Sequence, residues 1–166
     1  MDNNKKPTKD KNKLPYRKNV ACVLFQGERY LLVQSLGWPR DFWKFPQGGV
    51  KKGESMEETL KRELNEEVGV TDYKIVGISK HTNKYDWADE SVKIAGFRWR
   101  GQIQKFIVVE YLGNIDKVKA NTDEIQDCRW VNIEELFLNI DHDHKDFTNY
   151  KNTIEKILRE FKKLSD

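Results

Sequence analysis

The chain has 166 residues, of which 37% are hydrophobic and 34% are charged, and its formal net charge at pH 7 is +3. This length suffices for one domain with a buried core, and the composition excludes a wholly disordered chain. No apolar run approaches the roughly 20 residues that a membrane span needs, and no secretory signal is visible. We therefore expect a cytoplasmic protein that does not enter a membrane.

The first residues are predicted to form a flexible basic tail. Residues 1–14 are polar, rich in Lys and without hydrophobic periodicity. Residues 1–18 carry seven Lys or Arg and two Asp, a balance of +5, so the remainder carries about −2. Such a tail neutralises RNA phosphates or simply keeps the chain soluble, and composition leaves both roles open. Residues 15–166 are expected to form a single domain.

Strand patterns fill the first part of this domain. Residues 20–25 are apolar and predict a buried strand, and residues 29–34 predict its hairpin partner after a turn at Gly27. A loop is expected over residues 35–41, and a short extended segment over residues 42–47. The two cysteines, Cys22 and Cys128, lie alone in apolar segments, which favours buried thiols over a disulfide or a zinc site.

The second half of the chain alternates strands and helices. Its final segment has apolar residues at helical spacing from Tyr150 to Leu164, and Asn132 is a candidate cap for a shorter helix. The order of elements predicts an α+β fold with a mixed sheet between helices. The expected strands cover residues 73–79, 93–98, 102–112 and 128–131.

A helix with well-specified ends occupies the middle of the chain. Ser55 is a suitable N-cap, Glu58 completes a capping box three residues later, and Gly69 stands where a left-handed residue commonly ends a helix. An apolar row runs along this helix through Met56, Leu60 and Leu64, so one side of the helix should pack on a core.

Three carboxylates cluster on this helix beside the apolar row. Glu66 and Glu67 follow Glu63 by three and four residues, so the three side chains fall within an arc of about 100° on the helix. Like charges this close repel each other unless a cation lies between them. Hard oxygen ligands suit Mg²⁺ or Mn²⁺, especially where a substrate phosphate completes the coordination.

The stretch GGVKKGESMEETLKRELNEEVGV resembles the Nudix box, the signature of hydrolases that cleave a nucleoside diphosphate linked to another moiety. Every fixed position of that pattern is met here. The matching residues are Gly48, Glu54, Arg62, Glu63, Leu64, Glu66, Glu67, Gly69 and Val70. The resemblance implies the family's α/β/α sandwich, with a mixed β-sheet between helices, and a Nudix domain over residues 15–166.

Other segments resemble one branch of that family, the bacterial RNA pyrophosphohydrolases and their diadenosine polyphosphate hydrolase relatives. The segments YRKNV (16–20), WKFPQGG (43–49) and GQIQKF (101–106) are similar to the branch motifs YRPNV, WQFPQGG and GQxQKW. Lys18 and Lys44 depart from the Pro and Gln that the branch has there. These departures bear on nucleotide preference rather than on the hydrolase chemistry.

The resemblance implies roles for several residues. Glu63, Glu66, Glu67 and the more distant Glu124 would bind the metal, and Glu66 or Glu124 would take a proton from the attacking water. Arg62 lies one turn before Glu66, so we expect it to orient that carboxylate, although an ordinary surface i,i+4 pair is an open alternative. Glu54 is expected to brace the loop rather than to bind metal. The cofactor would be Mg²⁺, with Mn²⁺ as a substitute. Candidate substrate contacts are Arg17, Gln47, Tyr85 and Lys105, and core packing is an equal alternative for Tyr85.

The leading functional prediction is removal of phosphates from 5′-triphosphorylated RNA to leave a 5′-monophosphate. The first alternative is asymmetric hydrolysis of diadenosine tetraphosphate to ATP and AMP, and a second is hydrolysis of a broader range of nucleoside triphosphates. A binding module that has lost catalysis is a further alternative, which the intact carboxylate set disfavours. No obligate protein partner is inferred from the sequence.

Overall fold

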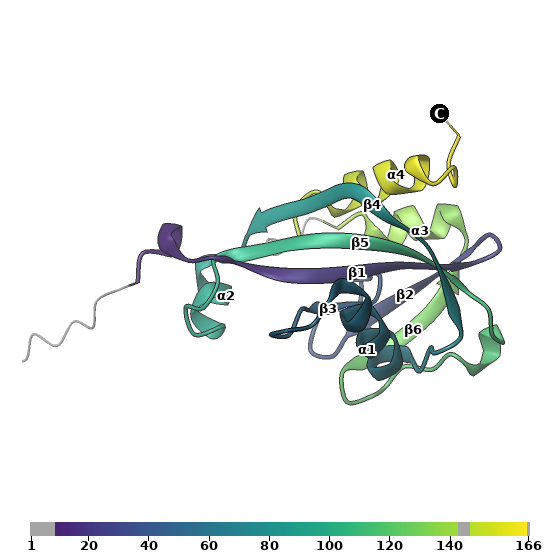
Figure 1. The fold of residues 1–166 in the computed structure, drawn as a ribbon, viewed down its shortest axis with the longest axis horizontal. Coiled ribbons are helices and arrows are strands. Elements are labelled where there is room, and N and C mark those ends of the chain that lie inside the picture. The colour runs from purple at the N-terminus through teal and green to yellow at the C-terminus, as the bar shows by residue number, and fades with distance from the viewer. Residues whose placement is uncertain (1–8, 143–146, 166) are drawn as a thin grey trace, which may run out of the picture.

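A computed structural model describes residues 9–142 and 147–165. Its six strands form one mixed sheet in the order β4-β5-β1-β2-β6, and β3 pairs with β1 beside β2 (Figure 1). The parallel pair is β1 with β5, and the other pairings between strands are antiparallel. The strands are β1 (Tyr16–Gln26), β2 (Arg29–Ser35), β3 (Gln47–Gly49), β4 (Tyr73–Asp86), β5 (Gly101–Tyr111) and β6 (Ile125–Val131).

Helices cover both faces of the sheet, as Figure 1 shows. The helix α1 packs on one face and α3 and α4 pack on the other, so the predicted α/β/α sandwich is confirmed. The short α2 connects β4 to β5 along the chain and lies at the end of the sheet where β5 begins. The helices are α1 (Met56–Val68), α2 (Asp89–Ile94), α3 (Ile133–Ile140) and α4 (Tyr150–Glu160), with 3-10 turns at Lys11–Lys13 and Ile115–Lys117.

The core consists of two layers because side chains alternate along β1. Ala21 and Val23 point towards α3 and α4, whereas Val20, Cys22 and Leu24 point towards α1. This strand is buried on both faces, which explains its continuous apolar run. Both cysteines are free thiols rather than a disulfide, as predicted, but only Cys22 is buried, and Cys128 is half-buried.

Several predicted elements differ from the structure in type or length: the strand expected over residues 73–79 continues to Asp86, and the one expected over 128–131 begins at Ile125. Residues 93–98 are not a strand, because α2 ends at Ile94 and the chain then turns through left-handed backbone at Gly96 (φ 70°) and Phe97 (φ 56°). The last helix ends at Glu160 rather than continuing to Leu164, because Lys162 is left-handed at φ 57°. Leu164 still packs against the core after the helix has ended.

The tail predicted over residues 1–14 lies partly outside the described residues. Within the described part, Lys11–Lys13 forms a 3-10 turn, and the Lys11 ammonium donates to the Trp87 carbonyl at 2.5 Å. Within the described ranges, no helix has both the length and the apolar character needed to cross a membrane.

Candidate active site

The caps predicted for α1 fix where its carboxylates point. The Ser55 hydroxyl accepts from the Glu58 backbone N–H, and the Glu58 carboxylate accepts from the Ser55 backbone N–H. Gly69 ends the helix in the left-handed region at φ 67°, which glycine adopts without strain. Leu60 and Leu64 are buried under the helix, so its acidic side lies at the border of the core.

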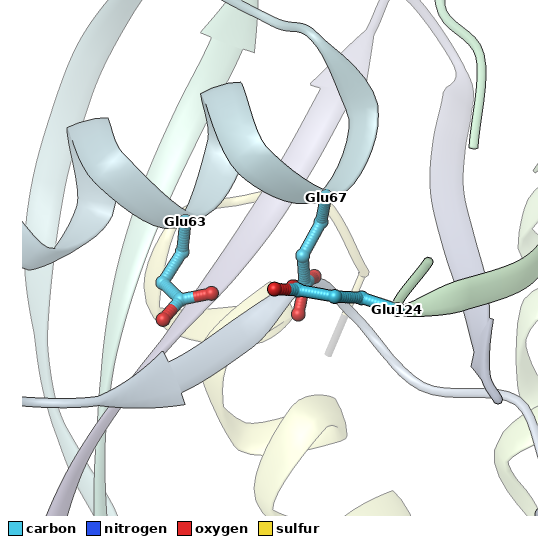
Figure 2. Close-up of side chains that lie close together, drawn as sticks. All are labelled: Glu63, Glu67 and Glu124. Carbon is cyan, nitrogen blue, oxygen red and sulfur yellow. The ribbon is translucent and has the colours of Figure 1, made fainter. Parts of the chain in front are cut away.

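Three carboxylates from two segments meet at one point. Glu63 and Glu67 come from successive turns of α1, and Glu124 immediately precedes β6. One oxygen of each lies within 4.8 Å of the others, and Figure 2 shows the three side chains converging. The fold therefore brings Glu124 next to α1, although the two are far apart in the sequence.

Asn121 attaches the segment that carries Glu124 to the end of α1. Its backbone N–H donates to the Glu67 carbonyl at 2.8 Å, and its side-chain amide donates to the Glu66 carbonyl at 2.9 Å. The Asn121 carbonyl in turn accepts from the backbone N–H of Glu124 at 3.0 Å. These bonds satisfy carbonyls at the helix end and hold Glu124 beside Glu67.

Burial and mutual repulsion disfavour the ionised form of the carboxylates in this cluster. Glu67 is 5% exposed, and its burial raises its pKa to about 8, with Glu63 and Glu124 adding repulsion; Lys44 and a backbone hydrogen bond from Gln47 oppose the rise. Burial also raises the pKa of Glu63. Among the described residues, the Oε2 atom of Glu67 has no hydrogen-bond partner, although buried polar atoms nearly always have one.

This donor set fits a divalent cation. Converging carboxylate oxygens, one of them buried and unpartnered, are what a hard cation such as Mg²⁺ or Mn²⁺ would satisfy. A cation would also offset the repulsion that Glu63 and Glu124 exert on the Glu67 carboxylate.

Arg62 links the glycine loop to the cluster. Its guanidinium forms a two-pronged ion pair with Glu54, at 2.8 and 2.9 Å, and donates to Glu63 at 2.6 Å. It also donates to the Gly49 carbonyl at 3.0 Å. Glu54 further accepts from the Thr59 hydroxyl, so Glu54 braces the loop as predicted from the sequence.

The two glycines before this loop allow close approach of side chains. A Cβ atom on Gly48 would lie 1.9 Å from Oε1 of Glu63, and one on Gly49 would lie 2.2 Å from a guanidinium nitrogen of Arg17. Real Cβ contacts are not this short, so any larger residue would displace these two charged groups. The glycines therefore place Glu63 and Arg17 directly against β3.

The carboxylates open into a cleft of about 560 Å³ on the face of the sheet that α4 also covers. The cleft has an acidic end, an aromatic wall and several polar groups from β1, β3 and β5. Its lining includes Glu63, Glu67, Glu124, Arg17, Asn19, Gln47, Gln102, Lys44, Trp38, Phe147 and Trp87.

The NUDIX domain family model matches residues 15–151 of the chain. The chain belongs to the Nudix family. An RNA pyrophosphohydrolase of Cereibacter sphaeroides is 36% identical over 135 residues, covering 78% of this chain and 83% of that protein. One of Campylobacter jejuni is 31% identical over 136 residues, covering 79% and 86%.

Solved structures share the fold of this Nudix domain. A C. elegans Ap4A hydrolase superposes with a TM-score of 0.65 at 20% identity, covering 89% of this chain and 99% of that one. A MutT protein from Methanosarcina mazei superposes with a TM-score of 0.63 at 21% identity, covering 90% and 98%.

The Nudix domain brings most of the predicted site residues to the cleft. Arg17 and Gln47 line it, and Gln104 donates to the Gln47 side chain at 2.5 Å. Tyr85 is buried beneath it, where its hydroxyl accepts from Gln102 at 2.9 Å. Tyr85 therefore contacts a cleft residue and is not itself part of the lining.

Two predicted residues lie elsewhere. Glu66 is outside the converging trio, with its side chain 40% exposed and one oxygen 3.4 Å from Arg62. Lys105 pairs with Val20 in the sheet and faces the α1 side, where it lines a separate hollow of about 270 Å³. Because Gln104 donates to Asn19 and Gln47 on the cleft side of the sheet, the alternation of β5 puts Lys105 on the opposite face.

Three residues in or near the cleft had no role predicted from the sequence. Gln102 and Gln104 are two polar residues on the same face of one strand, and this pattern could have predicted that Gln102 lies in a cleft. Lys44 interrupts an apolar segment, which signals a special environment for its charge. Asn121 carried no signal, because its contacts with α1 depend on the tertiary fold.

Proposed function

We propose that this Nudix domain is a Mg²⁺-dependent pyrophosphohydrolase that removes phosphates from 5′-triphosphorylated RNA ends and leaves a 5′-monophosphate. Mn²⁺ would substitute for Mg²⁺. The convergence of Glu63, Glu67 and Glu124 at the cleft carries this proposal. Relatives that are 30–36% identical over most of the chain are named RNA pyrophosphohydrolase, which supports RNA as the substrate.

Glu63, Glu67 and Glu124 would hold the metal ion. When bound, the ion neutralises the polyphosphate and lowers the pKa of a coordinated water. Arg62 acts on this cluster through Glu63, to which it donates at 2.6 Å, rather than through Glu66 at 3.4 Å. Its ion pair with Glu54 holds the guanidinium in place, so Glu63 keeps its orientation when substrate enters.

Hydrolysis also needs a base. Water attacks phosphorus, the anhydride P–O bond breaks, the pyrophosphate leaves with the bonding electron pair, and the water proton passes to a carboxylate. Glu66 and Glu124 are the two predicted acceptors. Glu124 lines the cleft and Glu66 does not, which supports Glu124 as the base.

Single Gln variants of Glu66 and Glu124 test this assignment. The variant that removes the base should slow turnover by at least about 10²-fold at saturating Mg²⁺. A variant that removes a metal ligand alone should regain activity as Mg²⁺ is raised. Full activity of both variants would show that neither carboxylate is the base.

Arg17 is the proposed phosphate contact among the four predicted substrate residues. Its guanidinium lies in the cleft against Gly49, 5.6 Å from the Trp99 ring centroid, and burial lowers its pKa. Gln47 would contact substrate from β3. Tyr85 would act through Gln102, and Lys105, on the opposite face, is not proposed to reach the same phosphates.

A competition assay tests the substrate. A short 5′-triphosphate RNA and diadenosine tetraphosphate are supplied together with Mg²⁺, and the products are separated by chromatography. Monophosphorylated RNA is the expected main product. Preferential release of ATP and AMP would instead identify a dinucleoside polyphosphate hydrolase, and preferential cleavage of free nucleoside triphosphates would identify a broader pyrophosphohydrolase.

Glu67→Gln is the control for contaminating activity and for a non-catalytic binding module. It removes a buried carboxylate of the cluster while keeping its size. Turnover that is abolished in this variant originates in the cleft, whereas turnover that persists does not. Absence of turnover in the wild-type chain at saturating Mg²⁺ or Mn²⁺ would favour the binding module.

A further inference from the structure

Lys44 is a lysine in the cleft whose side chain is almost wholly buried. The residue is 6% exposed, and its backbone is fixed to β2 by two hydrogen bonds with Val33, at 2.8 and 3.0 Å. Among the described residues, its ammonium has neither a direct ion pair nor a hydrogen bond. Lysine is rarely this buried without a partner, so the position requires an explanation.

The surroundings of the ammonium are aromatic on one side and acidic on the other. Its Nζ atom lies 5.8 Å from the Trp38 ring centroid and 5.6 Å from that of Phe147, within the range of cation–π attraction. Burial lowers the pKa of Lys44, and the charges of Glu67 and Glu63 oppose that change. All five side chains line the same cleft, with Lys44 between the carboxylates and the aromatic wall.

An anion entering this cleft would complete the arrangement. The acidic end would repel phosphate without a cation, while the aromatic wall offers a surface on which a nucleobase can stack. A phosphate between these two regions would meet Lys44, and a charge-assisted hydrogen bond would give its ammonium a direct partner.

We infer that Lys44 is a phosphate-binding residue that holds the polyphosphate between its metal-bound phosphate and its nucleoside. This inference rests on the proposed polyphosphate substrate and adds a residue to which the Nudix resemblance gave no role. Lys44 sets which phosphoanhydride bond lies at the carboxylates, because it fixes the chain from the nucleoside side. It is therefore a specificity-determining residue.

The alternative role for Lys44 is that of a counter-charge for Glu67. The two roles differ in what the removal of the charge changes. A phosphate contact affects the affinity for polyphosphate at saturating metal, whereas a counter-charge affects the affinity for the metal itself. Without the counter-charge, the carboxylates would attract a divalent cation more strongly.

Lys44→Met separates these roles, because methionine keeps the length and apolar stem of lysine without the charge. The probe is inorganic triphosphate with methylene bridges, which resists hydrolysis, titrated by calorimetry at saturating Mg²⁺. Loss of a charge-assisted hydrogen bond should weaken binding by about 10- to 100-fold. Lys74→Met, an exposed lysine on β4, is the matched control and should bind as the wild type does.

Unchanged binding of the probe by Lys44→Met, with tighter Mg²⁺ binding, would overturn the inference. If Lys44→Met does not fold, Lys44→Gln and NMR of the wild-type lysine Nζ provide the second test. The probe should shift the Lys44 signal, and an unshifted signal would also overturn the inference. Because the probe contains no RNA, failure on RNA substrates would contradict the proposed function while leaving this result intact.

Discussion

Single atoms at the glycine pair decide whether Glu63 can reach the cluster. Gly48 leaves room for the Glu63 carboxylate at a point where any Cβ would overlap it. Arg62 then holds that carboxylate from the other side. The position of one metal-binding oxygen therefore depends on a residue that contributes no side chain of its own.

Gly48→Ala should lower Mg²⁺ affinity and slow turnover. The new methyl group would lie 1.9 Å from Oε1 of Glu63, so the carboxylate must move away from Glu67 and Glu124. Displacing the Glu63 carboxylate from its binding position should lower metal affinity by at least about tenfold, measured by calorimetry with Mn²⁺ or Mg²⁺.

Gly77→Ala is the matched control for this variant. Its Cβ would lie 2.7 Å from the Phe161 ring, a similar crowding on β4 far from the carboxylates. This control should lose stability without losing metal affinity. Equal metal affinity in Gly48→Ala and the wild type would show that Gly48 does not control the position of the Glu63 carboxylate.

At the scale of elements, two connections place the site on the end of α1. One is the loop before the helix, braced by Glu54, and the other is the segment before β6, attached through Asn121. Each connection can be weakened without removing any of the three carboxylates.

Asn121→Ala should reduce metal affinity through Glu124. The variant loses the side-chain hydrogen bond to the Glu66 carbonyl, so the segment carrying Glu124 is held less firmly against α1. A loss of about 0.5–1.5 kcal/mol of coupling, roughly 2- to 10-fold in affinity, is expected for one hydrogen bond. Calorimetric titration with Mg²⁺ measures it.

Asn114→Ala provides the comparison within the same loop. Its side chain accepts from the Asp116 backbone N–H and, among the described residues, makes no hydrogen bond to α1. The affinity for Mg²⁺ should therefore remain that of the wild type. An equal fall in both variants would mean that general loosening of the loop, not the Asn121 contact, controls Glu124.

Glu54→Gln should lower stability more at neutral pH than in acid. The hydrogen bonds from Arg62 hold the pKa of Glu54 far below its usual value of 4.5. A carboxylate with a lowered folded-state pKa stabilises the fold above its unfolded pKa, and this contribution disappears as the pH falls towards the folded pKa. The difference in Tm between wild type and variant should thus shrink steadily below about pH 5.

Thermal unfolding in metal-free buffer from pH 7 to pH 3 measures this difference. Glu57→Gln, on an exposed side chain in the first turn of α1, is the control. A Tm difference for Glu54→Gln that stays constant over the whole range would show that its ion pair with Arg62 does not stabilise the fold.

Local chemistry explains which elements the sequence could predict. The ends of α1 depend on Ser55, Glu58 and Gly69, all within the helix or adjacent to it, and they were predicted correctly. The strand expected over residues 93–98 failed because a left-handed turn at Gly96 and Phe97 interrupts an alternating pattern. Such a turn in a phenylalanine has no signature in a single sequence.

The site shows the same division between local and tertiary information. Glu63 and Glu67 follow from spacing on one helix, whereas their meeting with Glu124 follows from a contact across more than 50 residues. The predicted orienting partner of Arg62 was Glu66, yet its shorter bond is to the adjacent Glu63. Side-chain rotamers distinguish between neighbours that sequence spacing alone leaves equivalent.

At the scale of the whole molecule, the cleft is built from both ends of the chain. The segment that leads into β3 crosses beneath α4, and Phe45 in this segment is completely buried. Its backbone N–H donates to the Tyr150 hydroxyl of α4 at 2.9 Å. The C-terminal helix thus supports the strand that carries Gln47 and the glycine pair.

Tyr150→Phe should destabilise the fold by about 1–3 kcal/mol, because it leaves a buried backbone N–H without a partner. Tyr30→Phe is the matched control, since Tyr30 is similarly buried and its hydroxyl makes no hydrogen bond among the described residues. Denaturant unfolding of both variants measures the difference.

If α4 also positions β3, Tyr150→Phe should weaken Mg²⁺ binding as well, because Gly48 and Glu63 move together. Loss of stability with unchanged metal affinity would confine α4 to a structural role, and equal stability of the two variants would show that this hydrogen bond contributes nothing.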